Sequence, residues 1–353
     1  MRALLLKGPG EAIVTELEKP SISLEDVLIR SHAVGICGSD VELYRGIRPE
    51  GYYRFPVVPG HEWAGEVVAV GERVRGISPG DKVVVEGFLF CGTCRNCRTG
   101  QTNLCEAGYD ELGFTRMGGL AEYVVVPARL VHTLPGDADL EQAALLEPTA
   151  VVAHAFLRAQ PRAGATVVVV GDGTIGLLAV QLARLSSPAI ITLIGSRNER
   201  LELGRQLGAT HTLNSRENDS QSLIHALTGG QGADFVFEGG NRPEGIEQAL
   251  NLVRRGGTVV LEGIAGAGAR LSTESDIFAL KHLAVYGIFG ASSAAWTYAV
   301  QIFRAGLLNL APLITHRFAL DEYQIALDTL ISRQAKMLKV LIVHNKDQEG
   351  REQ

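Results

Sequence analysis

Ala165-Thr-Val-Val-Val-Val-Gly-Asp-Gly-Thr-Ile-Gly176 is the stretch that decides the fold of this chain. Its β-branched run is typical of a strand buried on both faces of a parallel sheet, and Leu177–Leu185 after it is helical in character. Glycines between a strand and a helix favour a dinucleotide, because they allow a tight turn, close approach of a pyrophosphate and helix–strand packing. The free N–H groups at the start of the helix attract the anion. We therefore expect a dinucleotide to be bound by Gly171, Asp172, Gly173, Thr174, Ile175 and Gly176.

The alternation of strands and helices continues after this stretch. Further strands are expected at Ala189–Ile194, Ala233–Phe237 and Gly257–Glu262, with a helix that ends near Leu207. Such alternation predicts an α/β fold with a doubly wound parallel sheet, which we assign to residues 151–290. The apolar strand Leu283–Phe289 is a candidate edge that extends the sheet into a second subunit, or else an internal strand.

The end of the second strand indicates which nicotinamide cofactor is preferred. Sites that prefer NAD place Asp or Glu there, where it binds the ribose 2′-hydroxyl. This strand ends in Leu193-Ile-Gly-Ser196-Arg197, with no acid before Glu199. Ser196 can donate a hydrogen bond to a 2′-phosphate, and Arg197 brings a permanent positive charge with forked donors. The sequence favours NADP with NAD possible; an exposed arginine at a helix start, with NAD tolerated, is the alternative.

Toward the N-terminus, four cysteines are separated by two, two and seven residues: Cys91, Cys94, Cys97 and Cys105. This spacing lets four thiolates meet on one tetrahedral Zn²⁺, with no position left for water. Two disulfides are the alternative, but two-residue gaps suit chelation better in a chain that shows no secretory context. We therefore predict a structural zinc ion in a lobe at about residues 88–108.

The fifth cysteine, Cys37, belongs to a second and more dispersed set of potential ligands. It lies between Gly35 and Asp40, while His61 stands beside Glu62 after a Pro-Gly turn and Glu147 interrupts an apolar segment. Each signal is weak alone, because a lone cysteine is more often a small buried side chain and a lone histidine is more often structural. Together they offer S, N and O donors, as a catalytic zinc with an open position requires.

The remaining segments predict a first domain that is β-rich and discontinuous. Short apolar runs such as Val27–Ile29, Glu66–Val70 and Lys82–Val85 alternate with Gly and Pro turns over residues 1–150. We assign residues 291–353 to the same domain, and we expect the polar tail from Asn345 to be frayed.

Composition limits the classes of function. The chain has 353 residues, of which 46% are hydrophobic and 20% charged, as in roughly two globular domains. Its net charge of −6 argues against a nucleic-acid or anionic-membrane surface. Lys7 interrupts the N-terminal apolar run, and no run of about 20 apolar residues occurs. We therefore expect a cytoplasmic protein that binds neither nucleic acid nor membrane.

Taken in order, these motifs resemble the zinc-dependent medium-chain dehydrogenase/reductase family. The resemblance rests on Gly-Ile-Cys37-Gly-Ser39-Asp40, Pro59-Gly-His61-Glu62, the four-cysteine lobe, Leu146-Glu147-Pro148 and the glycine turn. The Leu-Glu-Pro variant is similar to the polyol branch, with sorbitol, threonine and glucose dehydrogenases. The resemblance implies a GroES-like catalytic domain (1–150 and 291–353), a Rossmann domain (151–290), an alcohol or ketone substrate and a homotetramer or homodimer.

The resemblance also implies roles for individual residues. Cys37 and His61 would ligate a catalytic zinc, with Glu62 and Glu147 as the remaining candidates, and Ser39 would begin the proton relay. Two positions depart from the pattern: Glu42 stands where many relatives have histidine, and residues 288–292 lack the arginine that some polyol dehydrogenases use. Residues 57–63 and 111–116 are closer to aminocyclitol dehydrogenases.

The sequence thus predicts a zinc-dependent oxidoreductase that moves hydride between a secondary alcohol and a nicotinamide cofactor. A polyol, a cyclitol or an amino alcohol fits as substrate, and two zinc ions per chain are expected, one catalytic and one structural. An inactive zinc-binding scaffold of the same fold and a quinone reductase-type NADPH enzyme remain as alternatives. A metal count separates them, since the scaffold would hold one zinc ion and the quinone reductase none.

Overall fold

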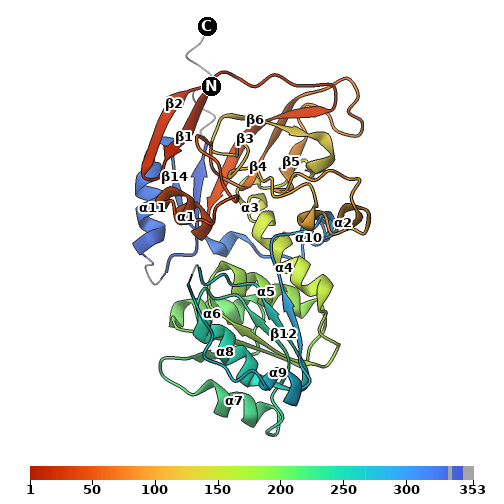
Figure 1. Ribbon diagram of the computed structural model, residues 1–353, viewed down its shortest axis with the longest axis vertical. Helices are drawn as coiled ribbons and strands as arrows, with labels where there is room; N and C mark the ends of the chain where they lie inside the picture. Colours follow the sequence, from red (N-terminus) through yellow and green to blue (C-terminus); the bar gives the residue numbers. More distant parts are fainter. Residues whose placement is uncertain (267, 333–335, 345–353) are drawn as a thin grey trace. The chain divides into compact units, whose positions relative to one another are not determined.

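The computed structural model describes residues 1–266, 268–332 and 336–344, so the predicted frayed tail lies outside the described residues. The chain forms two compact units. Unit 1 contains the residues up to Glu147 and those from Ala291 onward, and unit 2 is Pro148–Gly290. In Figure 1, unit 2 carries the green to light-blue colours. No helix among the described residues is both long and apolar enough to cross a bilayer.

Unit 2 is built on a six-stranded parallel sheet with the order β10-β9-β8-β11-β12-β13. The strands are β8 (Thr166–Val170), β9 (Ile190–Gly195), β10 (His211–Asn214), β11 (Ala233–Glu238), β12 (Val253–Leu261) and β13 (Ala284–Gly287). The helices are α4 (Leu146–Arg158, which begins in unit 1), α5 (Thr174–Arg184), α6 (Asn198–Leu207), α7 (Ser220–Leu227), α8 (Pro243–Leu252) and α9 (Ile277–Leu280).

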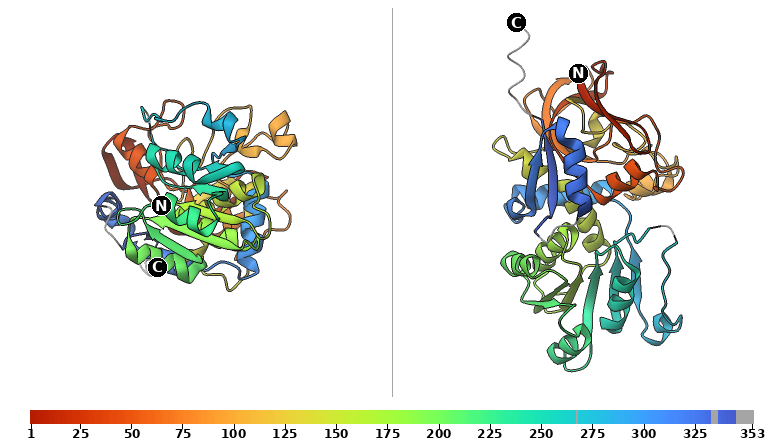
Figure 2. Two further views of the ribbon diagram at one scale, coloured as in Figure 1. Left: turned by 90° about the horizontal axis from the view of Figure 1, so that it is seen from below. Right: turned by 90° about the vertical axis from the view of Figure 1, so that its left-hand side faces the viewer.

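The valines of β8 explain why this strand is central. Val167, Val168 and Val169 are fully buried, as expected for a strand that is covered on both faces. The chain runs outward from β8 to β10 on one side and from β11 to β13 on the other. Connections between such parallel strands are nearly always right-handed, and Figures 1 and 2 show helices on both sides of the sheet. The predicted doubly wound sheet is confirmed.

Unit 1 is built on a seven-stranded sheet and a separate two-stranded one. The large sheet has the order β14-β15-β3-β4-β5-β7, with β6 also paired to β3, and β1 pairs with β2. The strands are β1 (Arg2–Gly8), β2 (Glu11–Glu16), β3 (Asp26–Ile36), β4 (Glu62–Val70), β5 (Lys82–Val85), β6 (Tyr123–Pro127), β7 (Val131–Thr133), β14 (Ile314–Phe318) and β15 (Lys339–Val343). The strands from the C-terminal segment, β14 and β15, therefore join the sheet of the N-terminal segment.

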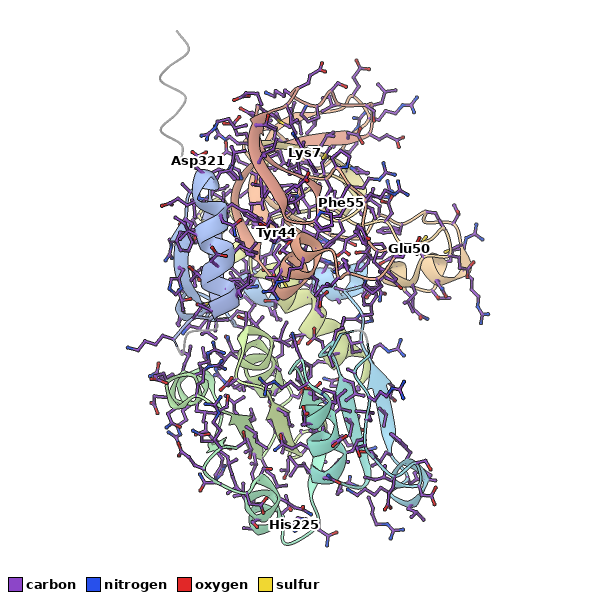
Figure 3. All side chains as sticks on the ribbon, turned by 60° about the vertical axis from the view of Figure 1, so that its left-hand side comes forward. Lys7, Tyr44, Glu50, Phe55, His225 and Asp321 are labelled. Carbon is purple, nitrogen blue, oxygen red and sulfur yellow. The ribbon has the colours of Figure 1, made fainter. Side chains whose placement is uncertain are left out.

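Short helices connect these strands. The α-helices are α1 (Gly38–Arg45), α2 (Arg95–Arg98), α3 (Leu140–Ala143), α10 (Ser293–Arg304) and α11 (Tyr323–Ser332), and the 3-10 helices are η1 (Thr102–Leu104), η2 (Ala128–Leu130), η3 (Ala311–Leu313) and η4 (Leu320–Glu322). A small apolar cluster of Leu6, Leu43, Val57 and Phe114 lies beside α1. Tyr44 and Phe55, both labelled in Figure 3, pack against this cluster.

The long strand β4 extends the predicted run of Glu66–Val70 back to Glu62. The first half of β4 contains Gly65, and a glycine within a strand is unfavourable when the sequence is considered alone. A Cβ atom at Gly65 would lie 2.2 Å from the carbonyl oxygen of Arg30 on β3, so only glycine fits there. Close pairing of β3 and β4 therefore explains the glycine, and this pairing places residues 35 and 62 side by side.

Candidate metal and cofactor sites

The four cysteines of the lobe converge as a tetrahedral metal site requires. Their sulfur atoms all lie within 4.8 Å of one another, and the Sγ atoms of Cys91 and Cys97 are 3.9 Å apart. A zinc tetrahedron with bonds of about 2.3 Å has edges of about 3.8 Å. Cys91, Cys94, Cys97 and Cys105 are free of disulfides. The residues present therefore fit a structural zinc ion.

Local hydrogen bonds prepare these sulfur atoms for a metal. The side chain of Cys94 begins α2 and accepts from the amide of Cys97 at 3.4 Å. Hydrogen bonds from Thr93 and from the Cys94 amide lower the pKa of Cys91 to about 5. Burial raises the pKa of Cys97 to about 12. A metal cation bound to Cys97 would counteract this rise in pKa, because a thiol that binds a metal ion loses its proton.

The second set of ligands comes together where β3 ends and β4 begins. Donor atoms of Cys37, His61 and Glu62 lie within 4.8 Å of one another. Cys37 follows β3 directly and precedes α1, and the antiparallel register pairs Gly35 with Glu62. His61 and Glu62 are 5% and 1% exposed. A sulfur, an imidazole and a carboxylate thus occupy one enclosed position, which fits a zinc ion with an open coordination site.

Asp40 lies beside the imidazole of His61. Its Oδ2 atom accepts from the Cys37 amide at 2.8 Å, and its Oδ1 atom lies 3.6 Å from Nδ1 of His61. The other ring nitrogen, Nε2, lies 3.5 Å from the hydroxyl of Ser39. Burial lowers the pKa of His61, but Asp40, Cys37 and Glu147 together outweigh burial and the pKa is raised. This arrangement leaves Nε2 as the nitrogen that could hold a metal.

Glu62 has a partner that sequence reasoning missed. Lys339 at the start of β15 donates to both carboxylate oxygens, at 2.7 and 2.6 Å, and is itself 5% exposed. Burial lowers the pKa of Lys339, but Glu62, Cys37 and Glu147 together outweigh burial and the pKa is raised. The available signal was a lysine at the head of the apolar run Lys339–Val343. Each Glu62 oxygen accepts one hydrogen bond from Lys339, so a metal bound by Glu62 would share this carboxylate with the ion pair.

Glu147 stands apart from the group of three. It lies in the first turn of α4 and is not among the atoms that lie within 4.8 Å of one another. Burial raises its pKa to about 8, although the charge of His61 opposes the rise. The charge of His61 therefore acts on Glu147. Only three of the four predicted ligands, however, have donor atoms within 4.8 Å of one another.

The glycine turn joins β8 to α5 with the geometry expected for a pyrophosphate. Gly171 has φ = 114°, a conformation that favours glycine. A Cβ atom on Gly176 would lie 1.8 Å from the carbonyl oxygen of Gly171, so the helix packs closely on the turn. Gly173 precedes Thr174 and Ile175 without a capping side chain, and space is open where its Cβ would be. The free amides of α5 therefore fit a dinucleotide phosphate.

Asp172 links this turn to the end of β9. Its Oδ2 atom accepts from the amides of Ser196 and Arg197 at 2.7 and 2.8 Å. Its Oδ1 atom lies 3.6 Å from Arg197 and 3.6 Å from Arg200, a second arginine that sequence reasoning missed. A side chain on Gly195 would collide with Asp172, since its Cβ would lie 2.4 Å from the Asp172 Cβ. The position of the usual ribose-binding acid is therefore closed to any side chain.

Two family models match the chain: the alcohol dehydrogenase GroES-like domain over residues 23–136 and the zinc-binding dehydrogenase model over residues 174–305. An L-threonine 3-dehydrogenase of Bacillus subtilis is 34% identical over 346 residues, covering 97% of this chain and 98% of that protein. A sorbitol dehydrogenase of the same species is 31% identical over 351 residues, covering 98% of each. A Sinorhizobium meliloti zinc-binding dehydrogenase, solved with NADP, has a TM-score of 0.88 at 32% identity, covering 97% of this chain and 98% of that one.

These matches define an NAD(P)-dependent oxidoreductase of the alcohol dehydrogenase class. More narrowly, the chain belongs to the zinc-dependent medium-chain dehydrogenase family. The family and the combination of a GroES-like with a Rossmann domain are confirmed as predicted from the sequence. None of these matches supports the inactive scaffold or the quinone reductase-type enzyme.

Proposed function

We propose that this enzyme oxidises a secondary alcohol to a ketone, reversibly, with a polyol, a cyclitol or an amino alcohol as substrate. The observation that carries the proposal is the set of Cys37, His61 and Glu62 donor atoms within 4.8 Å of one another. The two curated relatives support it, because threonine and sorbitol, for which they are named, both contain secondary hydroxyl groups.

Each chain would hold two zinc ions. The four cysteines of the lobe would bind the structural ion, which has no open position. Cys37 and His61 would bind the catalytic ion, with Glu62 or Glu147 as the third protein ligand. Glu62 belongs to the group of donor atoms and Glu147 does not, but Glu62 shares both of its oxygens with Lys339.

When bound, the zinc ion supplies a Lewis acid for the alcohol oxygen and the nicotinamide supplies a hydride acceptor. Ser39, whose hydroxyl lies 3.5 Å from Nε2 of His61, would accept the proton of the alcohol while it releases its own hydroxyl proton outward. Asp40 would hold the imidazole in one tautomer and orientation. Lys339 would hold the Glu62 carboxylate in place.

Residues 151–290 would form the cofactor domain, and residues 1–150 with 291–353 the catalytic domain. The glycine turn would bind the pyrophosphate at the start of α5. We infer that NADP is preferred over NAD. Gly195 stands where sites that prefer NAD have an acidic residue, and the guanidinium groups of two arginines lie near Asp172 at the end of the strand. Ser196, Arg197 and Arg200 would then bind the 2′-phosphate.

The enzyme would be a cytoplasmic homodimer or homotetramer. The edge strand β13 supports an association through the sheet of unit 2, since it is paired only with β12 among the described strands. Exposed apolar side chains lie on and around this edge: Phe278, Leu280, Val285 and Phe289. Exposed edges and apolar patches of this kind are typical of subunit interfaces.

A metal count combined with a substrate panel tests the proposed function. The purified enzyme is expected to hold two zinc ions per chain and to reduce NADP⁺ in the presence of at least one polyol, cyclitol or amino alcohol. Removal of the catalytic zinc with a chelator should abolish turnover. A protein with one zinc ion per chain and no turnover would refute the catalytic assignment.

A further inference from the structure

A loop at residues 109–116 brings a second polar group next to the candidate zinc ligands. The ring of Phe114 lies 4.8 Å from the ring of His61. A Cβ atom on Gly113 would come within 3.0 Å of the backbone nitrogen of His61. The loop therefore packs directly on the turn that carries His61.

Hydrogen bonds within this loop hold Glu111 in one position. Its carbonyl oxygen accepts from the amides of Thr115 and Arg116 at 3.0 Å each, and its amide donates to the Thr115 hydroxyl at 2.7 Å. Asp110 pairs with Arg116 at 2.9 Å on the exposed side. Glu111, in contrast, is only 5% exposed. Hydrogen bonds therefore hold the backbone at Glu111, and its carboxylate is largely shielded from solvent.

Tyr109 and Arg48 surround this carboxylate. The Tyr109 hydroxyl donates to Oε2 of Glu111, and Arg48 donates to the Tyr109 hydroxyl at 2.9 Å. The Nη2 atom of Arg48 lies 3.9 Å from the same Oε2 atom. The guanidinium also lies 3.8 Å from the centre of the Phe114 ring, the ring that contacts His61. The group is therefore anchored beside the candidate metal site.

Glu111 has hydrogen-bonding capacity that its neighbours do not use. A carboxylate can accept about four hydrogen bonds, yet within the described part of the chain only Tyr109 donates one to this side chain. Burial raises the pKa of Glu111, as expected where few donors replace water. A hydroxyl group of a substrate could donate to Oε1, because the Tyr109 hydrogen bond is made to Oε2.

We propose that Glu111, Tyr109 and Arg48 form a subsite for a neutral hydroxyl group of the substrate, so that polyhydroxylated alcohols are the preferred class. This inference rests on the proposed dehydrogenase function. A hydroxyl group can donate to Oε1 of Glu111 and accept from Arg48, so it matches both charges. An ammonium group is repelled by Arg48, and a carboxylate or phosphate by Glu111.

The position of the subsite sets the length of a suitable substrate. Phe114 contacts both His61 and Arg48, so one phenyl ring separates the candidate metal ligands from the subsite. A sugar alcohol or a cyclitol carries further hydroxyl groups beyond its reacting carbon that could bind there. Propan-2-ol has none, and L-threonine presents an ammonium and a carboxylate instead.

Wild type and Glu111→Gln are compared with NADP⁺ and NAD⁺ on sorbitol, myo-inositol, propan-2-ol and L-threonine. Wild type is expected to prefer sorbitol or myo-inositol to the other two. Glu111→Gln should raise KM for that polyol at least about tenfold, the loss typical of a hydrogen bond to a charged group. Its kcat/KM for propan-2-ol should stay within about twofold of wild type. The exposed Glu50→Gln (Figure 3) is the matched control and should change neither value.

If Glu111→Gln does not fold, Tyr109→Phe is the second test. It should also raise KM for the polyol and leave kcat/KM for propan-2-ol close to the wild-type value. An equal loss on propan-2-ol and polyol, or a wild type that prefers propan-2-ol or L-threonine, refutes the subsite while the dehydrogenase function stands. No turnover of any of the four alcohols with either cofactor refutes the proposed function and the subsite with it.

Discussion

At the scale of single residues, Asp172 shows how one carboxylate organises the candidate cofactor site. It fixes the backbone at the end of β9 through two amides and faces two guanidinium groups through its other oxygen. In sites that prefer NAD, an acidic residue at the end of the second strand binds the ribose 2′-hydroxyl. In this chain the acidic residue at the site, Asp172, belongs to the glycine turn instead. Under the proposed preference for NADP, the end of β9 would bind the 2′-phosphate.

Replacement of Arg197 or Arg200 by alanine should weaken NADPH binding selectively. A charge-assisted hydrogen bond contributes roughly 1.5–3 kcal/mol, so the Kd for NADPH should rise at least about tenfold, while that for NADH should barely change. Fluorescence titration of the reduced cofactors measures both values. Arg205→Ala is the control, because this exposed arginine on α6 pairs with Glu202. Equal losses for both cofactors, or a wild type that binds NADH more tightly, would contradict the preference for NADP.

Replacement of Cys37 by serine should remove one zinc ion and most of the turnover. Cys37 lies at the end of β3, outside the hydrophobic core, so the melting temperature should change by only a few degrees. Plasma emission spectroscopy counts the metal, and an NADP⁺ assay reports kcat, which should fall at least about a hundredfold. Retention of both zinc ions with near-normal kcat would show that Cys37 is not a catalytic ligand.

Glu238 at the end of β11 should make unit 2 less stable as pH rises. Burial raises its pKa from 4.5 to about 7, so the folded form keeps a proton that the unfolded form releases. The free energy of unfolding therefore falls between about pH 4.5 and pH 7. Glu238→Gln removes this loss and should be more stable than wild type at pH 8 by up to roughly 3 kcal/mol.

Thermal unfolding of the cofactor-free protein at pH 5 and pH 8 measures this difference. Glu244→Gln is the control, since Glu244 is an exposed carboxylate in the first turn of α8. The explanation fails if Glu238→Gln has the same pH dependence as wild type.

At the scale of elements, the four-cysteine lobe is tied to the body of unit 1 by a small polar network. The hydroxyl of Thr102 in η1 lies 3.1 Å from that of Ser293, and it also accepts from the Ser293 amide at 2.8 Å. Ser293 donates to Glu86 at 2.6 Å, and Glu86 lies 3.0 Å from His132 on β7. Loss of order in the lobe should therefore spread to α10 and the sheet.

Replacement of Cys97 by serine should damage stability more than chemistry. A closed zinc site contributes folding energy directly, and Cys97 is the most buried of the four ligands. The melting temperature should fall by roughly 10 °C or more, consistent with a loss of several kcal/mol, while the folded fraction should keep its KM. A variant that melts like wild type but is inactive would instead make the lobe part of the catalytic site.

The sequence predicted those elements whose pattern is local. The valine run and glycines of β8 and α5 fix a strand, a turn and a helix, and the cysteine spacing fixes a metal lobe. Lys339 and Arg200 could not be found in this way, because their partners Glu62 and Asp172 lie 277 and 28 positions away in the chain. Only the pairing of β15 with β3, and of α6 with the glycine turn, brings these charges together.

At the scale of the whole molecule, the edge strand β13 should mediate association of subunits. Val285→Lys places a charge in the middle of this strand, where it would disfavour pairing with a second edge. Light scattering should show a smaller assembly than for wild type, with the circular dichroism spectrum unchanged. Lys336→Ala, at an exposed lysine of unit 1, is the control. An unchanged mass would place the interface elsewhere.

X-ray anomalous scattering at the zinc edge, on crystals of the enzyme with NADPH, tests the central claim most directly. The account predicts two peaks per chain, one enclosed by the four cysteines of the lobe and one bonded to Cys37 and to Nε2 of His61. A peak at the lobe alone, with no zinc at Cys37 and His61, would contradict it.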